Sequence, residues 1–334
     1  MAGHRRMVWG WARASHRGKM SRFKILSIDG GGIKGVFPAS FLGEVETAFD
    51  LTSAGRYFDL IAGTSVGGIL ALGLGLGLTA REMAKFLVSL GPGVFPPGNT
   101  STLRLLLGFN RYDPGPLRSA LETIFGKKTL ADSQIRLLIP SFDASKADIH
   151  IYKTAHSKRL MMDYRVEAVE VAMATAAAPT YFPAYDSKNN IAFVDGGVWG
   201  NNPVALAVVE ALTLLRQDPD NIDVLSLGCT DEPLDFKSGW HTGLYWLRRA
   251  VFAAMRGQSR SALGMAMHLT GRDKGADRIL RIDPIVRTNR FCLDGTKQIV
   301  DLRGLGYSHA RNALPDIRER FFSEPCEPFV SLHK

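Results

Sequence analysis

A serine between two glycines is the clearest candidate for chemistry in this chain. Residues 60–72 read LIAGTSVGGILAL, so Ser65 stands two residues after Gly63 and two before Gly67. Apolar residues predict a buried strand before the serine and a helix after it. Glycines at this spacing let a tight strand-to-helix turn pass close to neighbouring backbone and present the serine hydroxyl. The pattern predicts a nucleophile, although it also suits a plain glycine-rich turn.

A nucleophilic serine needs a base, and the sequence offers two kinds. A Ser-His-Asp triad of the α/β-hydrolase type needs a histidine late in the chain, but no late histidine stands in a glycine-flanked loop after an expected strand. Asp195 does follow such a strand, ahead of Gly196 and Gly197. Burial raises the pKa of a carboxylate, which lets it accept a proton from serine. The residues favour a Ser65–Asp195 dyad, and a Ser-His-Asp esterase is the alternative. The late histidines are His241, His268, His309 and His333.

A second glycine-rich stretch, GGGIKG at residues 30–35, follows an expected strand. It matches the G-x-G-x-x-G fingerprint of dinucleotide-binding folds, which would indicate a dinucleotide-dependent oxidoreductase. That fingerprint also requires an acid about 20 residues on, at the end of a second strand, whereas Asp50 follows a helical segment. Successive amides at a helix N-terminus can instead hold an anion, and Lys34 would add positive charge. The stretch therefore suits either a phosphate or an oxyanion.

Taken in order, these motifs resemble those of the patatin-like phospholipases. The resemblance covers residues 23–230 and implies an α/β protein with three α/β/α layers around a central, mostly parallel sheet. It also implies an enzyme that cleaves fatty acyl esters of membrane phospholipids, with peripheral membrane contact and no contact with DNA or RNA. The motifs that carry the resemblance lie at 29–35, 63–67, 195–197 and 201–203.

The resemblance further implies a role for each motif. Asp195 would take the proton of Ser65, the serine would attack an ester carbonyl, and glycine amides would stabilise the oxyanion. Water activated by the same carboxylate would release the fatty acid, so the reaction requires no metal and no other cofactor. The family often has arginine where this chain has Lys34, which keeps the charge but lacks the planar guanidinium. The oxyanion hole is assigned to Gly30, Gly31, Gly32 and Lys34, and the shape of the turns to Gly35, Gly63, Gly67, Gly196 and Gly197.

The region after about residue 231 is basic: from Lys237 to Arg303 it contains 13 Lys and Arg against five Asp. It looks similar to the C-terminal part of bacterial patatin-like effectors of antiphage (CBASS) systems, which degrade membrane phospholipid once a cyclic dinucleotide binds. The segment 293–311 carries this likeness. It implies a cyclic dinucleotide as activator and oligomerisation on activation, while a solvated helical face is the plainer alternative. Candidate contacts for the nucleotide or a lipid headgroup are Arg248, Arg249, Arg256, Arg260 and Arg272.

Strands and helices are expected to alternate around these motifs, and several strands are apolar throughout, which is typical of a sheet covered on both faces. Thr79 with Glu82 predicts a capping box, Asn202 predicts a helix cap, and residues 91–101 predict a loop. Strands are expected at 23–28, 57–62, 135–142, 149–154, 191–194, 222–227 and 278–282, and helices at 36–49, from 66, 79–90, 114–125, 166–177, from 203, 243–269 and 296–313.

Length and composition limit the classes of protein to which the chain can belong. The 334 residues, 46% of them apolar, can bury a full core. No apolar run approaches the roughly 18 residues of a transmembrane helix, and three sparse cysteines indicate a reduced cytoplasmic protein, which would act at the inner face of the membrane. Residues 1–19 hold five of the nine net positive charges, and we expect disorder there or a misassigned start. The expected division is 1–19, a catalytic part at 23–230 and a helical basic part at 231–334.

Two further rivals share the expected fold. One is a lipase or esterase of the same family that is active without a nucleotide. The other is a non-catalytic nucleotide-binding or scaffold protein, against which the intact Ser65 and Asp195 argue.

Overall fold

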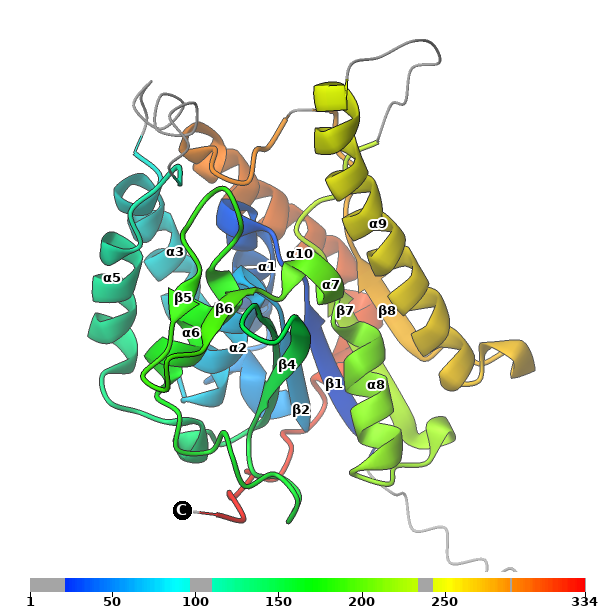
Figure 1. Ribbon diagram of the computed structural model, residues 1–334. Helices are drawn as coiled ribbons and strands as arrows, with labels where there is room; N and C mark the ends of the chain where they lie inside the picture. Colours follow the sequence, from blue (N-terminus) through cyan, green and yellow to red (C-terminus); the bar gives the residue numbers. More distant parts are fainter. Residues whose placement is uncertain (1–21, 97–109, 234–242, 289, 334) are drawn as a thin grey trace, which may run out of the picture.

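A mixed β-sheet forms the centre of the chain in a computed structural model that describes residues 22–96, 110–233, 243–288 and 290–333, without the side chains of 243–249, 251 and 252. Within these residues the sheet has eight strands in the order β5-β6-β3-β2-β1-β7-β8, and β4 pairs with β3 outside this path (Figure 1). The strands are β1 (Phe23–Ile28), β2 (Leu60–Gly63), β3 (Arg136–Asp143), β4 (Asp148–Lys153), β5 (Tyr185–Asp186), β6 (Ala192–Asp195), β7 (Ile222–Leu227) and β8 (Ile279–Ile282).

Most neighbouring strands run parallel, which confirms the expected kind of sheet. β1 lies between β2 and β7 and is parallel to both, and β3 and β8 continue the parallel arrangement outward. β4 and β6 pair with β3 in the antiparallel sense, and β5 pairs with β6 in the same sense. The carboxyl ends of the parallel strands therefore meet at one edge, where open α/β sheets place their binding sites.

Helices cover both faces of the sheet, so the expected three layers are confirmed. In β1, Ile25 packs into the core under α8 and α9, whereas Leu26 and Ile28 pack into the larger core under the other helices. Burial on both faces explains why such strands are mostly apolar. The helices are α1 (Val36–Ala48), α2 (Val66–Gly75), α3 (Ala80–Val94), α5 (Gly115–Phe125), α6 (Ala168–Ala176), α7 (Gly197–Gly200), α8 (Val204–Thr213), α9 (Gly243–Leu269) and α10 (Ile299–Phe321).

Two helices continue past the ends that the sequence predicted, at 90 and 313. The expected loop at 91–101 is wrong over its first residues, because α3 continues through Pro92 to Val94, which is buried in the core. The rest of that loop, from 97, lies outside the described residues. α10 likewise continues through Pro315 to Phe321, which is fully buried. In both helices the burial of a late apolar side chain outweighs the local cost of the proline.

The expected capping box is present, and the cap expected at Asn202 is displaced. Thr79 accepts a hydrogen bond from the amide of Glu82, and the Glu82 side chain accepts one from the amide of Thr79, which is a complete capping box. Asn202 Oδ1 accepts from the amide of Val204 at 3.1 Å, but Asn202 stands two residues before the helix begins at Val204, and Pro203 takes the N-cap position. This hydrogen bond fixes the point where the chain leaves α7 and enters α8.

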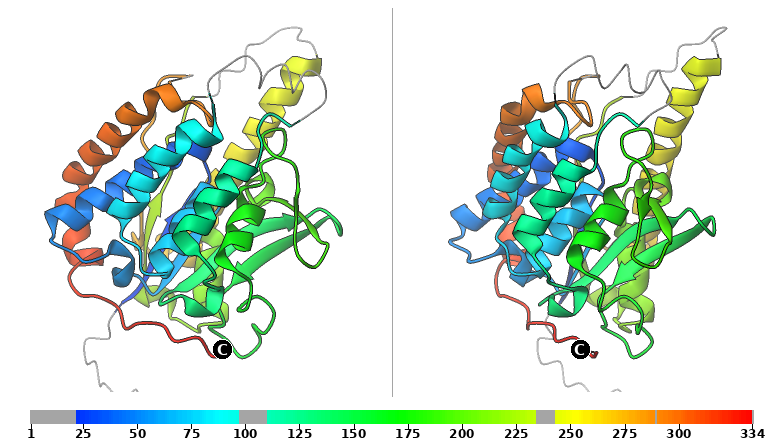
Figure 2. Two further views of the ribbon diagram at one scale, coloured as in Figure 1. Left: turned by 90° about the vertical axis from the view of Figure 1, so that its left-hand side faces the viewer. Right: turned by 60° about the vertical axis from the view of Figure 1, so that its left-hand side comes forward.

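The residues after 231 contribute to the same sandwich as those before it. β8 pairs with β7 at one edge of the sheet, α9 packs on α8, and α10 packs along α1. Figure 2 shows α1, α3 and α10 side by side on one flank. No helix of the described ranges is both long and apolar enough to cross a bilayer.

Candidate active site

Ser65 occupies the sharp turn between β2 and α2, at the carboxyl edge of the sheet. Its backbone has φ of 57°, a left-handed conformation that L-residues rarely adopt outside functional turns. The turn closes only because glycines flank it: a side chain at Gly67 would collide with the carbonyl of Ile28, and one at Gly63 with the carbonyl of Gly67. The strained turn holds the hydroxyl at the end of β2.

A threonine that was not predicted from the sequence holds this turn through hydrogen bonds of its hydroxyl group. The amide of Ser65 donates to Thr175 Oγ1 at 3.0 Å, and the Thr175 hydroxyl donates to the carbonyl of Pro140. Thr175 lies near the end of α6 and is fully buried. A polar residue near the end of an otherwise alanine-rich helical sequence was the available signal.

Asp195 is the hydrogen-bond partner of Ser65. It ends β6, its amide donates to the carbonyl of Ala177 at 3.0 Å, and its Oδ1 accepts from the amide of Gly197 at 2.7 Å. Its other oxygen, Oδ2, accepts from Ser65 Oγ at 2.6 Å. Burial raises the pKa of Asp195 to about 6, even though the bonds from Ser65 and Gly197 favour the ionised form. A carboxylate of this basicity is suited to accept the serine proton.

This pKa predicts how activity depends on pH. Only ionised Asp195 can accept the proton of Ser65, so we expect hydrolysis to fall about tenfold per pH unit below pH 6 and to level off above it. The measurement is kcat/KM for a soluble ester between pH 4.5 and 8. An unchanged rate down to pH 4.5 would contradict a base with this pKa.

The same burial predicts the pH dependence of stability. Because the folded-state pKa of Asp195 lies above the ordinary value of 3.8, its neutral form favours folding at low pH, and this contribution is lost as pH rises through about 6. Asp195→Asn should therefore raise Tm relative to the wild type more at pH 8 than at pH 4.

One of the three glycine amides in the run is already bonded within the protein. The amide of Gly30 donates to the carbonyl of Asn201 at 3.0 Å, so its hydrogen is already engaged and the expectation of Gly30 as an oxyanion donor needs correction. Within the described part of the chain, the amides of Gly31 and Gly32 have no hydrogen-bond acceptor. Gly32 has φ of 55°, and a side chain there would collide with the carbonyl of Leu293.

Lys34 has a backbone carbonyl as its hydrogen-bond partner. Its Nζ donates to the carbonyl of Thr230 at 3.2 Å, in the loop after β7. The side chain therefore ties the 3₁₀ turn Gly32–Gly35 to that loop. Gly35 allows close packing, since a side chain there would collide with Val66 at the start of α2. Gly196 likewise leaves no room for a side chain, because Pro140 O is in the way.

A buried ion pair that the sequence reading also missed anchors the glycine run. Arg281 on β8 donates to both oxygens of Asp29, at 2.8 and 2.6 Å, and also to Ser226 Oγ and to Asp283. Asp29 immediately precedes the three glycines and is 4% exposed. The paired guanidinium and carboxylate thus fix the entry into the run from a strand 252 residues later in the chain.

Removing Arg281 should destabilise the protein strongly. Arg281→Met leaves Asp29 and Asp283 without their main partner, and breaking a buried pair in this way costs about 3–5 kcal/mol. Urea unfolding measures the loss. The matched control is Arg311→Met, which removes an exposed pair with Glu44 and should cost less than about 1 kcal/mol. Equal losses of unfolding free energy for the two variants would show that the buried Asp29 pair contributes no more to stability than an exposed pair does.

No described histidine serves Ser65 or Asp195. His268 pairs with Asp273 on the surface, His309 packs edge-on against Phe37, and His333 lies near Tyr164. His241 lies outside the described residues. Asp50, the acid that a dinucleotide site would need, follows α1 and ends no strand. The described residues also contain no group of His, Cys, Asp or Glu that could hold a metal ion.

The five candidate arginines do not form one cluster. α9 has 27 residues and therefore spans about 40 Å. Arg248 and Arg249 lie near its start, with side chains outside the described ones, whereas Arg272 follows its end. There the chain enters β8, at the amino edge of the sheet and opposite Ser65. A single small ligand cannot reach both ends, so Arg272 does not belong with the others.

Arg256 and Arg260 both face Asp231, in the loop after β7. Arg256 donates to Asp231 Oδ2 at 2.8 Å and to the carbonyl of Glu232 at 3.0 Å, and the Arg260 guanidinium lies 3.6 Å from the same carboxylate. Asp231 directly follows Thr230, whose carbonyl binds Lys34. These contacts connect the middle of α9 to the glycine run.

A serine–carboxylate pair at a strained turn, on the carboxyl edge of a parallel sheet between helical layers, is the arrangement of a serine ester hydrolase of the α/β class. Comparison with known proteins narrows the class. A family model described as patatin-like phospholipase matches residues 26–208. The chain therefore belongs to the patatin-like phospholipase family, a family of ester hydrolases, as the motifs predicted.

Three bacterial relatives each carry the name cGAMP-activated phospholipase. One from Escherichia coli is 30% identical over 92% of this chain and 95% of its own length. One from Vibrio cholerae is 32% identical over 79% of this chain and 82% of its own. One from Pseudomonas aeruginosa is 37% identical over 62% of each chain. The first alignment includes the basic region after residue 231.

Proposed function

We propose that this protein hydrolyses fatty acyl esters of membrane phospholipids with a Ser65–Asp195 dyad. The observation that carries the proposal is the 2.6 Å hydrogen bond from Ser65 Oγ to a buried carboxylate whose pKa is about 6. The family supports a phospholipase. The test is release of fatty acid from phospholipid vesicles by the purified protein and its loss in a Ser65 variant.

The geometry supports a two-step acyl transfer. Asp195 Oδ2 takes the proton as Ser65 Oγ attacks the ester carbonyl, and the amides of Gly31 and Gly32 donate to the oxyanion that forms. Collapse of the tetrahedral intermediate, with the proton passed from Asp195 to the leaving oxygen, releases the lysolipid and leaves an acyl-serine. Asp195 then takes a proton from water, which attacks the acyl-serine. Collapse of this second tetrahedral intermediate passes that proton from Asp195 to Ser65 Oγ, frees the fatty acid and restores the dyad.

The second part of the proposal is activation by a cyclic dinucleotide. The names of the three relatives support it, and so does the basic surface of α9. A nucleotide phosphate that binds Arg256 and Arg260 would compete with Asp231 for them. Asp231 is next to Thr230, whose carbonyl binds Lys34. Replacement of Asp231 by the phosphate would therefore affect the position of the turn that contains Gly32 and Lys34. Such contacts give the two sites a physical connection.

This activity would be used at the inner face of the cell membrane, in antiphage defence of the CBASS type. Activation there can involve oligomerisation and peripheral binding to the bilayer. A phospholipase of this family that is active without a nucleotide is the second candidate function. It is favoured by the Ser65–Asp195 bond and the family, because hydrolysis by the dyad requires no contact with the basic region.

A further inference from the structure

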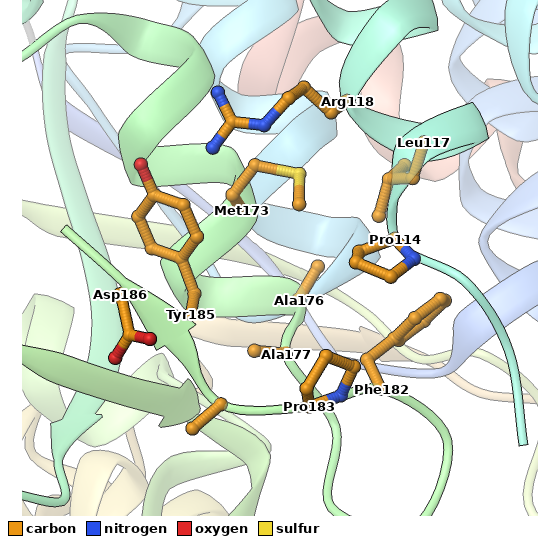
Figure 3. A pocket seen from close by; sticks show the side chains of 11 residues that line it. Pro114, Leu117, Arg118, Met173, Ala176, Ala177, Phe182, Pro183, Tyr185 and Asp186 are labelled. Atoms are coloured by element: carbon orange, nitrogen blue, oxygen red, sulfur yellow. The ribbon is translucent and has the colours of Figure 1, made fainter. Parts of the chain in front are cut away.

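A cavity of about 210 Å³ lies beside α6, between α5 and the β5 strand (Figure 3). Its walls are mostly apolar. Leu117 comes from α5, Met173 and Ala176 from α6, and Phe182 and Pro183 from the segment before β5. A surface of this kind favours hydrocarbon, because each methylene buried in it contributes about 0.8 kcal/mol.

One residue in the wall of this cavity is hydrogen-bonded to the backbone of Asp195. Ala177, in its wall, accepts the hydrogen bond from the amide of Asp195. Thr175, two residues earlier, holds the amide of Ser65. The last turn of α6 therefore has the dyad bound to its backbone and side chain while its alanines line the cavity.

One end of the cavity is polar. The Arg118 guanidinium lies 5.5 Å from the ring centre of Tyr185 and 3.6 Å from a carboxylate oxygen of Glu122. Figure 3 shows this guanidinium and Ala177 on opposite sides of Met173. Because Arg118 already has an acid and an aromatic partner, this end suits the limit of a hydrocarbon chain better than a phosphate.

We propose that the cavity binds the acyl chain of the substrate ester, and that Met173, Arg118 and Tyr185 limit the chain length accepted. The inference rests on the proposed function, since it needs Ser65 to carry the acyl group. Met173 and Ala176 are three residues apart on one face of α6, so a chain that enters beside Ala177 runs along that face. The Met173 side chain lines the cavity between its two ends.

The test uses soluble p-nitrophenyl esters from butyrate to dodecanoate with two substitutions at the same position. Met173→Phe fills the cavity and should lower the ratio of kcat/KM for decanoate to that for butyrate by roughly tenfold or more. Met173→Ala enlarges it and should shift the preferred ester to a longer chain. Opposite shifts from one position are not expected of a general packing defect.

The matched control is Val169→Ala, a buried change one turn earlier on α6 that lies outside the cavity. It should leave the decanoate-to-butyrate ratio as in the wild type. Thermal unfolding checks that each variant folds, and Met173→Ala alone decides if Met173→Phe does not. An unchanged chain-length profile in the folded Met173 variants would overturn the acyl cavity and leave the dyad standing. Failure of the wild type to hydrolyse any ester would overturn the function itself.

Discussion

Ser65→Ala should reduce hydrolysis of phospholipid by about ten-thousand-fold or more, because no other group at the turn can form the acyl-enzyme. The fold should remain intact, since the change removes one hydroxyl and leaves the amide bond to Thr175 in place. Fatty acid release from vesicles and thermal unfolding are the two measurements. Ser133→Ala, at another buried serine with its own hydrogen bond, is the matched control and should retain activity.

Asp195→Asn should cause a loss of similar size, because an amide cannot accept the serine proton. The asparagine oxygen can still accept from the amide of Gly197, so the end of β6 keeps its shape. His268→Gln is the comparison, since His268 pairs with Asp273 away from the dyad. Activity that survives Asp195→Asn but disappears on changing a histidine would replace the dyad with a Ser-His-Asp arrangement.

The sequence predicted most of this fold because its strands are buried on both faces. A short and mostly apolar run such as Phe23–Ile28 is typical of a central strand. The helix ends were harder, since Pro92 and Pro315 are local signals for termination and only the packed sheet shows that Val94 and Phe321 are buried.

The site likewise combines features that the sequence predicts with contacts that it does not. Local spacing predicts the turn around Ser65, but the partners that hold it come from distant parts of the chain. Thr175 is 110 residues from Ser65, and Arg281 is 252 residues from Asp29. Neither contact can therefore be recognised from a short stretch of sequence. The three glycines of the run also look equivalent until Asn201 is seen to occupy the amide of Gly30.

The basic region illustrates the opposite error, in which residues close in composition are far apart in space. Arg256 and Arg272 belong to the same basic stretch, yet α9 places about 20 Å between Arg256 and its last residue, Leu269, and Arg272 follows that end. Charge counts therefore pointed to a binding surface without locating it, and the shared contact with Asp231 is what singles out Arg256 and Arg260.

A cyclic dinucleotide should raise phospholipid hydrolysis by about ten- to a hundredfold, the range expected when two sites are coupled. The measurement is fatty acid release from vesicles across a panel of cyclic dinucleotides, cGAMP included, with buffer as reference. Arg256→Gln combined with Arg260→Gln should raise the nucleotide concentration needed for half activation, because both guanidinium groups at Asp231 are lost. Hydrolysis of a soluble ester without nucleotide reports whether the dyad itself is intact in this variant.

Arg272→Gln is the matched control for this effect. It removes the same charge at the far end of α9, near the amino edge of the sheet, where a ligand bound at Arg256 cannot reach. We expect its response to the nucleotide to equal that of the wild type, since no described contact joins Arg272 to Asp231 or to the glycine run. Equal rates with every nucleotide and with buffer would leave a constitutive phospholipase. Loss of activation in Arg272→Gln alone would show that the nucleotide does not bind beside the loop that contains Thr230 and Asp231.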